Sequence, residues 1–551
     1  MANTVERAVE ARFDQATADA ATYDVVVLGA GGAGMAAALV AAIDGARVLL
    51  VERTAYVGGT TAWSAGSTWI PCTPHAGEVG ATDSLAQVEQ YLTRAIGDRT
   101  PTALRRTFLE RGAEAVAFVE KHSDVRFRAY PHHPDYLSEL EGSALNGRAL
   151  EPLPFDGRKL GALFARVRPP IPEFTVLGGM MVDRNDIFHL LRLKRSMASF
   201  RHSTKILLRH AVDRLRRPRG TRLVMGNALV GRLLHSLAQR ANVTLVLETS
   251  VAQIVREGKH VTAVTLVHHG ERRSVRVTGG VVLATGGFNL HPQRRAEFLP
   301  GIDPAWCPGV PGHTGEAHDV AMAAGARYGT GAMSHAFWAP VSVRKRADGS
   351  TAAFPHFVMD RGKPGMLAVD GRGERFVNET TSYHLFGLAM QAAPGKSAVP
   401  AFLIADADAL RKYGIGMVRP GGRGLDAYIA EGYLITAPSI ALLAAKLGID
   451  AARLEATVAR VNGYAETGVD PDFQRGTTAY QRNLGDATWT GKNPTMGALK
   501  QAPYYAVKLY PGDIGAATGF VTDGDARVLD GEGAAIPGLY AVGNDMHSIM
   551  G

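Results

Sequence analysis

Cysteine is scarce in this sequence, with only Cys72 and Cys307 among 551 residues. Two cysteines cannot build a disulfide framework and do not have metal-ligand spacing, so we expect no metal site and predict a reducing compartment. The N-terminus carries Glu6, Glu10 and Asp14 before any apolar run, unlike a secretory signal. Apolar runs long enough to span a bilayer are also missing. The sequence therefore predicts a cytoplasmic protein.

Positive charge is concentrated in one part of the chain. The formal net charge is +8, yet residues 191–222 hold eleven Lys or Arg and one acid, a local charge of +10 that leaves the remaining chain at −2. A local excess of this kind argues against nucleic acid as a partner.

Apolar residues recur at helical spacing inside this basic segment. They are Ile206, Leu207, Leu208, Ala211, Val212 and Leu215, and they alternate with Arg201, Lys205, Arg209, Arg214, Arg216 and Arg217. One interpretation is a helix that lies on an anionic membrane, which makes the protein peripheral to the inner face of that membrane. The other is a helix packed on the protein with a solvated basic face.

The length of the chain predicts two domains around a cleft, because one hydrophobic core rarely supports so many residues. Short apolar runs at 23–28 and 46–51 flank an Ala-rich helical stretch at 34–44, which predicts a βαβ unit. Strand patterns return at 243–247, 261–267, 275–277 and 281–284. Residues 100–220 read as mainly helical, with Pro-rich interruptions at 130–135 and 168–172.

These patterns predict an α/β protein with a dinucleotide-binding, Rossmann-like domain and an inserted α+β domain that caps the substrate. We expect an N-terminal extension over 1–22, the dinucleotide-binding domain over 23–300 with its basic insert at 191–222, the cap over 301–500, and a return to the first domain over 501–551.

The run 29–34 has glycine at the three positions that a dinucleotide fold requires. Gly29 permits the tight turn, Gly31 lets the backbone approach a pyrophosphate, and Gly34 allows close helix packing. The N-terminus of the following helix offers free N–H groups to phosphates. Glu52, eighteen residues after Gly34, is placed to accept hydrogen bonds from ribose hydroxyls. This motif alone does not distinguish NAD from FAD.

Three later segments carry a family resemblance. Residues 58–66, 284–287 and 538–544 are similar to the flavin-contacting segments of the fumarate reductase and 3-ketosteroid dehydrogenase group, in the same order, and the resemblance covers about residues 23–551. It implies FAD as the cofactor. The implied FAD contacts are Gly29, Gly31, Gly32, Ala33, Gly34, Glu52, Arg53, Gly58, Gly59, Thr60, Thr61, Ser64, Ala65, Gly66, Val251, Ala284, Thr285, Gly286, Gly543 and Asn544.

The same resemblance supplies candidate catalytic residues. The stretch 373–379 resembles the loop that leads to the family's proton-transfer group, and five residues after its Asn the fumarate reductases have an arginine where this chain has Tyr383. Ketosteroid Δ1-dehydrogenases place a tyrosine there as general base. Tyr136 resembles the supporting tyrosine of those enzymes, with Tyr130 as a nearby alternative. A phenol has a pKa near ~10, so we expect hydrogen bonds or positive potential that favour the phenolate.

The leading hypothesis is FAD-dependent α,β-desaturation of a cyclic ketone, and the first candidate reaction is 3-ketosteroid 1,2-dehydrogenation. The expected partners are the ketone and an unidentified electron acceptor. A smaller ring ketone, such as an oxocyclohexane carboxylate, fits the same chemistry. A fumarate-reductase-like enoate reductase is a further alternative, which Tyr383 disfavours because a phenol cannot clamp a dicarboxylate as arginine does. The last alternative is a non-catalytic flavin-binding module.

Several residues near these motifs receive other expectations. The relatives continue into a Tyr-Pro-Gly-x-Gly stretch that holds the substrate carbonyl, so we expect this chain to be truncated or disordered beyond Gly551 and the carbonyl-polarising groups to lie there. The similar stretch at 510–512 is assigned no such role. His335 and Trp338 either line the substrate cavity or pack in the core. Residues 314–316 are expected to support the start of a helix.

Overall fold

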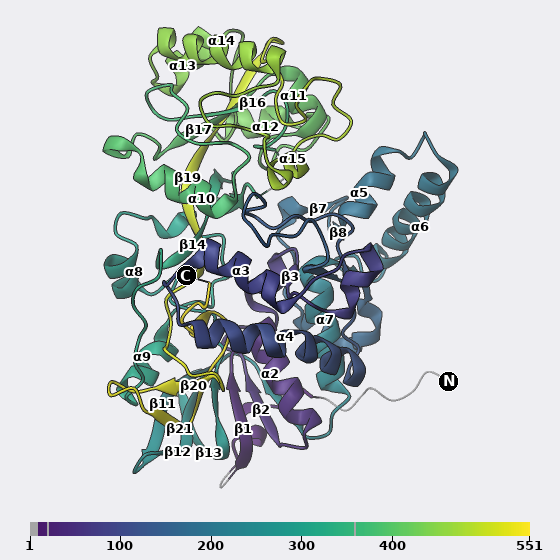
Figure 1. Cartoon of the computed structure of the whole chain (residues 1–551). Coiled ribbons are helices and arrows are strands. Elements are labelled where there is room, and N and C mark those ends of the chain that lie inside the picture. Colours follow the sequence, from purple (N-terminus) through teal and green to yellow (C-terminus); the bar gives the residue numbers. More distant parts are fainter. Residues whose placement is uncertain (1–8, 19–20, 358–359, 551) are drawn as a thin grey trace.

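The computed structural model describes residues 9–18, 21–357 and 360–550, and an eight-stranded sheet forms the lower part of the molecule in Figure 1. The strands of this sheet follow the order β10 (Val243–Val246), β2 (Val48–Val51), β1 (Thr22–Leu28), β13 (Glu271–Leu283), β12 (His260–His268) and β11 (Thr249–Glu257), with β21 (Ala535–Ala541) beside β13 and β20 (Arg527–Leu529) beside β21.

Five of these strands run parallel and end at one edge. Leu28 pairs with both Val51 and Leu283, Val51 pairs with Val246, and Leu283 pairs with Ala541. The first part of β13 instead pairs antiparallel with β12, so this long strand joins the parallel core to an antiparallel hairpin. Loops that follow β1, β2, β10, β13 and β21 therefore emerge side by side.

The parallel strands are apolar on both faces because both faces are covered. On one face α2 (Gly32–Ile43) and α7 (Met225–Ala238) pack together over β1 and β2, and Val27, Leu50 and Leu234 are fully or almost fully buried there. On the other face the hairpin β11–β12 and α9 (Glu316–Ala323) cover a second cluster that contains Val26 and Leu49.

A second, six-stranded sheet lies in the upper part of Figure 1. Its order is β15 (Thr351–Pro355), β14 (Ala336–Lys345), β19 (Tyr504–Ala516), β17 (Ala401–Ala405) and β16 (Met366–Val369), with β18 (Ile435–Ala437) on β19, and every pair is antiparallel. The helices of this part are α10 (Tyr383–Ala392), α11 (Ala407–Tyr413), α12 (Leu425–Ala430), α13 (Ile440–Leu447), α14 (Ala451–Thr467) and α15 (Ala479–Leu484).

The remaining elements connect or flank the two sheets. The helices are α1 (Phe13–Ala16), α3 (Leu85–Ile96), α4 (Thr102–His122), α5 (Arg184–Leu191), α6 (Met197–Arg214) and α8 (Pro292–Phe298). The short strands are β3 (Thr68–Trp69), β4 (Phe127–Ala129), β5 (Ala149–Pro152), β6 (Phe155–Asp156), β7 (Thr175–Val176), β8 (Met180–Met181) and β9 (Arg222–Leu223). The 3-10 helices are η1 (Gly59–Trp63), η2 (Pro74–Val79), η3 (Gly157–Arg166), η4 (Pro172–Phe174), η5 (Pro304–Trp306), η6 (Pro394–Lys396) and η7 (Gly543–Asp545).

The α/β fold class and the predicted βαβ unit are confirmed, with β1, α2 and β2 close to the expected bounds. The strand patterns at 275–277 and 281–284 belong to one strand, β13. The helical prediction for 100–220 is correct for α4, α5 and α6 and wrong between α4 and α5, where short strands and 3-10 helices occur. Several prolines in that stretch, which remove backbone donors, favour this irregular structure.

The predicted domain bounds stay a proposal. Strand β19 continues the second sheet as far as Ala516, so the chain leaves that sheet inside the segment that we assigned to the first domain. Residues 1–8 and 19–20 of the predicted N-terminal extension lie outside the described residues. Within the described ranges, every helix is too short or too polar to cross a bilayer.

Candidate active site

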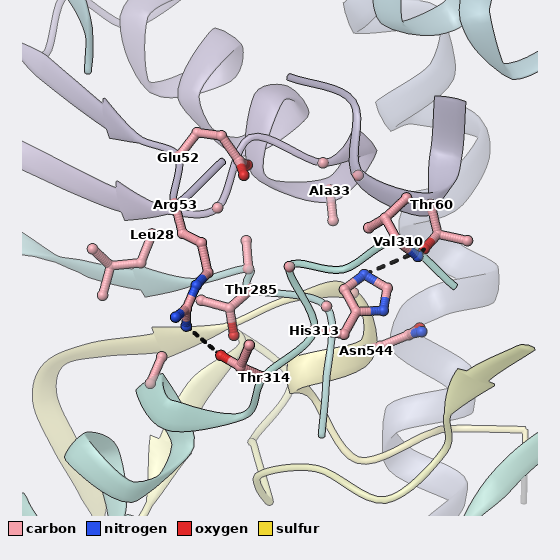
Figure 2. A pocket seen from close by; sticks show the side chains of 18 of the residues that line it. Leu28, Ala33, Glu52, Arg53, Thr60, Thr285, Val310, His313, Thr314 and Asn544 are labelled. Atoms are coloured by element: carbon pink, nitrogen blue, oxygen red, sulfur yellow. Dashed lines mark hydrogen bonds between the residues drawn. The ribbon is translucent and has the colours of Figure 1, made fainter. Parts of the chain in front are cut away.

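A cleft lies along the edge where the parallel strands end (Figure 2). It is lined by Gly29 after β1, Glu52 after β2, Ala284 after β13 and Val542 after β21. Ligands of open parallel sheets bind outside the carboxyl ends of the strands, because the connecting loops diverge there. The topology therefore places the predicted dinucleotide site where this fold binds ligands.

The glycines of the glycine-rich turn have two different roles: some allow close packing, and one borders space for a ligand. An added Cβ at Gly29, which has φ +107°, would lie 2.3 Å from the Ala284 carbonyl oxygen, and one at Gly34 would lie 1.9 Å from the Gly29 oxygen. Gly29 and Gly34 are thus required for strand and helix packing. An added Cβ at Gly31 would meet nothing within 4 Å, although Gly31 lines the cleft at the start of α2. This free space suits a phosphate group at a helix N-terminus.

Glu52 closes the turn from the other side. Its Oε2 accepts a hydrogen bond from the Ala30 N–H at 3.0 Å, and its Oε1 accepts from the N–H and the hydroxyl of Thr54 at 2.9 and 2.8 Å. A carboxylate has about four acceptor positions, so the carboxylate can still accept ribose hydroxyls on its cleft side. Figure 2 shows Glu52 beside Arg53, which binds Thr314 and forms an ion pair with Glu316 at 2.9 Å.

Two polar side chains in the cleft wall have unused hydrogen-bonding atoms. Arg168 is buried, donates to Thr54 at 2.7 Å, and its Nε has no partner among the described residues. The Nδ1 of His313 likewise has no partner there, while its Nε2 lies 3.3 Å from the Thr60 hydroxyl. Burial lowers the pKa of His313 to about 4, so the ring is neutral at physiological pH. A buried guanidinium without an ion pair in the described chain fits an anionic ligand such as FAD.

Asp545 joins three segments of the cleft. Its carboxylate accepts from the Thr285 hydroxyl and the Gly287 N–H, both at 2.8 Å, and lies 2.8 Å from Nε2 of His318. Burial disfavours its charge, but His318 and the N–H donors together hold the pKa of Asp545 below its usual value. The aspartate therefore fixes the end of β13 relative to the turn after β21. Sequence analysis missed Asp545, although it directly follows Asn544.

Most of the predicted FAD contacts meet in the cleft. Those that line it are Gly29, Gly31, Gly32, Ala33, Glu52, Arg53, Gly59, Thr60, Thr61, Val251, Ala284, Thr285, Gly286, Gly543 and Asn544. Those that lie outside its lining are Gly34, Gly58, Ser64, Ala65 and Gly66. Gly34 packs on Gly29 as described above, and the other four belong to the turn around η1. For all of them, direct contact with FAD remains a prediction.

The two candidate catalytic tyrosines meet. The hydroxyls of Tyr136 and Tyr383 lie 2.8 Å apart, and the two rings are packed edge to face. Tyr480 contacts the ring of Tyr136 and Phe357 contacts the ring of Tyr383. The hydroxyl of Tyr130 instead bonds to Ser67 at 2.8 Å. The structure thus brings Tyr136, rather than Tyr130, to the hydroxyl of Tyr383.

Opposing effects act on the Tyr383 hydroxyl. Burial raises the pKa of Tyr383, whereas the hydrogen bond from Tyr136 and the positive charge of Arg361 lower it, and the net pKa lies above its usual value. The expected hydrogen bond and positive potential are therefore both present, but burial outweighs them. Either hydroxyl can donate this bond, and burial raises the pKa of Tyr136 well above its usual value. The residue is nevertheless 39% exposed, so it borders space that water reaches.

Arg361 is fully buried beneath this pair, and sequence analysis missed it. Its Nε donates to the His356 carbonyl at 2.9 Å and its Nη2 to the Phe357 carbonyl at 3.0 Å, and a third bond reaches the Glu379 carbonyl. These partners are neutral carbonyl groups, and among the described residues Arg361 forms no ion pair. Asp360 and Glu379 act on its charge from a greater distance, and the charge still lowers the pKa of Tyr383.

Buried ion pairs hold the segments that carry both tyrosines. In the 373–379 loop, Arg375 binds Glu379 at 2.7 Å and Asp470 at 2.8 Å. Directly before Tyr136, Asp135 accepts from Arg148 at 2.6 Å and from the Trp69 indole at 2.8 Å. The removal of one partner from such a pair leaves an uncompensated buried charge, so these clamps fix the loops strongly.

Two segments connect the cleft to the tyrosines. The chain from the cleft-lining Thr61 continues to Ser67, which bonds to Tyr130. The chain from Asn544 continues to Met550, which packs against the same hydrophobic cluster as Leu137, the neighbour of Tyr136. Tyr383 begins α10, which packs on β14 of the second sheet, so the tyrosine pair lies where this sheet meets the loop that carries Tyr136.

Comparison with known proteins agrees with this geometry. The sequence model of the FAD binding domain family matches residues 24–551. The chain belongs to this family. It is 38% identical to a 4-oxocyclohex-2-ene-1-carboxylate 5-dehydrogenase of Sinomonas cyclohexanicum, over 96% of this chain and 89% of that protein. It is 35% identical to a 3-oxosteroid 1-dehydrogenase of Mycolicibacterium smegmatis, over 96% and 93%.

A solved member of the family has the same fold. The crystal structure of 3-ketosteroid Δ1-dehydrogenase from Sterolibacterium denitrificans in complex with 1,4-androstadiene-3,17-dione has a TM-score of 0.89 and 32% identity to this chain, and covers 96% of this chain and 95% of that one. The predicted family and the predicted cofactor FAD are confirmed. The protein is an FAD-dependent oxidoreductase that acts on CH–CH groups.

The other expectations are met as packing roles. Trp338 is 2% exposed and its indole N–H donates to Ser334, and Nδ1 of His335 lies 2.9 Å from the Thr518 hydroxyl. Gly315 is the N-cap of α9, with a left-handed backbone and no side-chain cap, and Glu316 is the first residue of the helix. Thr314 and Glu316 also bind Arg53 at the cleft. Tyr510 stacks on Trp306.

We predict that Gly31→Ala lowers FAD affinity at least tenfold, which is about 1.4 kcal/mol, without loss of folding. The added methyl meets no protein atom within 4 Å but occupies the space beside the helix N-terminus. Titration of apoprotein with FAD measures affinity, and thermal unfolding of apoprotein measures stability. Gly77→Ala, which also meets nothing within 4 Å and lies outside the cleft lining, is the control. Unchanged affinity in Gly31→Ala contradicts the assignment.

Proposed function

We propose that this protein desaturates a cyclic ketone at its α and β carbons, with 1,2-dehydrogenation of a 3-oxosteroid as the first candidate reaction. The observation that carries this proposal is the phenol pair Tyr136–Tyr383, whose oxygens lie 2.8 Å apart. A desaturase needs a base for the acidic α-hydrogen and a separate acceptor for the β-hydrogen.

Tyr383 is the base in this proposal. Bound FAD supplies the hydride acceptor. The Tyr383 oxygen removes the α-proton, while the donated hydrogen bond from Tyr136 and the charge of Arg361 stabilise its phenolate form. Since the substrate loses one proton and one hydride, the new C=C bond forms between the two carbons. The proton then moves from Tyr383 through Tyr136, which is 39% exposed, to water.

This arrangement disfavours the reduction of an unsaturated dicarboxylate. A permanently charged arginine both clamps a carboxylate and donates a proton, and a phenol does neither with comparable charge.

The steroid is the first candidate because the groups around the phenol pair are aromatic. Phe357 and Tyr480 pack on the two tyrosines, and His133 lies near Tyr136. Flat apolar rings bind well against such surfaces. Relatives named as 3-oxosteroid dehydrogenases support this choice.

An oxocyclohexane carboxylate is the second candidate. Relatives named for oxocyclohexene and oxocyclohexane carboxylates are 38% and 33% identical to this chain. Arg184 lies over the ring of Tyr130, with its guanidinium carbon 5.9 Å from the ring centroid. A cation beside the tyrosine-bearing loop can bind a ring carboxylate.

Anaerobic reduction of the bound flavin tests the reaction and the substrate together. We expect a 3-oxosteroid with a saturated C1–C2 bond to bleach the oxidised flavin spectrum, and 4-oxocyclohexanecarboxylate to bleach it more slowly at equal concentration. A reversed order assigns the smaller ketone. If neither ketone bleaches the flavin while dithionite does, the desaturase proposal fails.

Replacement of the base tests its role. Tyr383→Phe is expected to lower turnover by about 100- to 10,000-fold, because general base catalysis contributes this much, with FAD content unchanged. Steady-state rates with the accepted ketone measure the effect. Tyr464→Phe, on α14 and hydrogen-bonded to Asp472, is the control and should retain full activity. Wild-type turnover in Tyr383→Phe excludes the proposed base.

The hydrogen bond from Tyr136 sets the pH dependence. Because this bond lowers the pKa of Tyr383, its removal in Tyr136→Phe raises that pKa. Only the phenolate accepts the proton, so activity falls as pH drops through the pKa, and the rising limb of the rate profile should move to higher pH in Tyr136→Phe. Tyr130→Phe, whose hydroxyl bonds to Ser67, should leave the limb in place. A limb that shifts in Tyr130→Phe instead reverses the assignment of the two tyrosines.

A further inference from the structure

Helices α5 and α6 form a hairpin that projects from the body of the molecule, at the right of Figure 1. Beneath α6, a small cluster of Met180, Val182 and Ile206 attaches the hairpin to the turn between β7 and β8. The hairpin coincides with much of the basic segment 191–222. Within this segment residues 197–214 form α6, whereas Arg222 begins the short strand β9.

Helix α6 is oriented opposite to an ordinary amphipathic surface helix: several of its polar residues face the protein and most of its apolar residues face outward. Ser199, Ser203, His210 and Asp213 are buried against the protein, with Ile206 among them. Asp213 accepts from the N–H and hydroxyl of Thr221, and Nε2 of His210 lies 3.0 Å from the Leu177 carbonyl. The inner face is thus held largely by polar contacts.

The outer face of α6 is apolar. Met197 is 73% exposed, Leu208 62% and Leu215 83%. Phe200 and Val212 are also exposed, and the spacing of these residues places them along the outer side of the helix. Eight of the seventeen exposed large hydrophobic residues in the described chain belong to the hairpin and the adjoining turn. They are Leu177, Phe188, Leu191, Met197, Phe200, Leu208, Val212 and Leu215, and we call them the hairpin surface.

Cations without carboxylate partners lie among these residues. Those that form no ion pair within the described chain include Arg192, Lys194, Arg195, Arg201, Lys205 and Arg216. By contrast, Arg209 pairs with Asp156 at 2.6 Å and Arg222 with Asp186 at 2.6 Å, so these two have structural roles. The outer side of the hairpin is therefore both apolar and positively charged.

We propose that the hairpin surface docks on a lipid bilayer that contains anionic lipids. The cores of protein–protein interfaces are depleted in lysine, whereas here Lys and Arg alternate with large apolar residues along one helix. That combination is typical of helices that lie in the membrane interface, where apolar side chains enter the acyl boundary and cations meet lipid phosphates. The long Arg and Lys side chains also reach the headgroups while their stems stay apolar. This inference does not depend on which ketone the enzyme takes.

Flotation of the full-length, FAD-loaded protein with vesicles tests the proposal. We expect the protein to float with vesicles of phosphatidylcholine and phosphatidylglycerol, to stay in solution with pure phosphatidylcholine, and to dissociate as salt rises, because salt screens exposed charges. Failure to float with the anionic vesicles at low salt overturns the proposal. Vesicle binding that does not depend on salt concentration or on lipid charge also overturns the proposal.

Two variants locate the contact. Leu208→Gln with Leu215→Gln, and separately Arg201→Gln with Lys205→Gln, should each weaken vesicle binding at least tenfold while flavin content and circular dichroism stay unchanged. The control is Leu442→Gln with Val469→Gln, which replaces exposed apolar residues outside the hairpin and should bind as wild type. Equal binding by all variants contradicts the proposal. Loss of a solution dimer in Leu208→Gln with Leu215→Gln, without vesicle binding by the wild type, assigns the surface to a second copy of this chain instead.

Discussion

The shared edge at which β1, β2, β10, β13 and β21 end is the constraint on which the site depends. The register that pairs Leu28 with Val51 and Leu283, and Leu283 with Ala541, brings loops separated by up to five hundred residues in sequence to one place. The glycine turn, Glu52, the end of β13 and the turn after β21 can form one cleft only because these strands are parallel and in step. A change of register moves every lining residue at once.

The tyrosine pair depends on a different kind of support. Neither Tyr136 nor Tyr383 lies in the parallel sheet, and each follows a loop that is fixed by a buried ion pair, Arg148 with Asp135 or Arg375 with Glu379. Buried pairs of this kind contribute little net stability, because their desolvation offsets their attraction. Their effect is positional: the two phenol oxygens stay within hydrogen-bonding distance although they belong to segments that are 247 residues apart.

Local patterns in the sequence were sufficient for parts of the fold and the site. The glycine spacing before α2 predicted the turn because backbone conformation and close packing are local requirements, and the 373–379 segment identified Tyr383 by its resemblance. Arg361 and Tyr480 could not be found in this way, since each reaches the tyrosine pair through tertiary packing and neither is in a recognisable pattern. The basic segment shows the limit most clearly. Its helix was predictable, but the outward direction of Leu208 and Leu215 was not, because apolar spacing alone does not say which face is buried.

The opposing effects on Tyr383 explain why one residue needs so many neighbours. Burial disfavours the phenolate form of Tyr383, which is the form that the proposed base role requires. Tyr136 and Arg361 offset part of this effect of burial on the Tyr383 pKa. The Arg361 guanidinium donates to the His356, Phe357 and Glu379 carbonyls and, among the described residues, forms no ion pair. A carboxylate in the same place would instead cancel the positive charge, and direct pairing of Arg361 with the phenolate would weaken the base. In the proposed reaction, a buried cation that contacts only carbonyl groups, together with a phenol as the direct donor, would help Tyr383 to take a proton and pass it on.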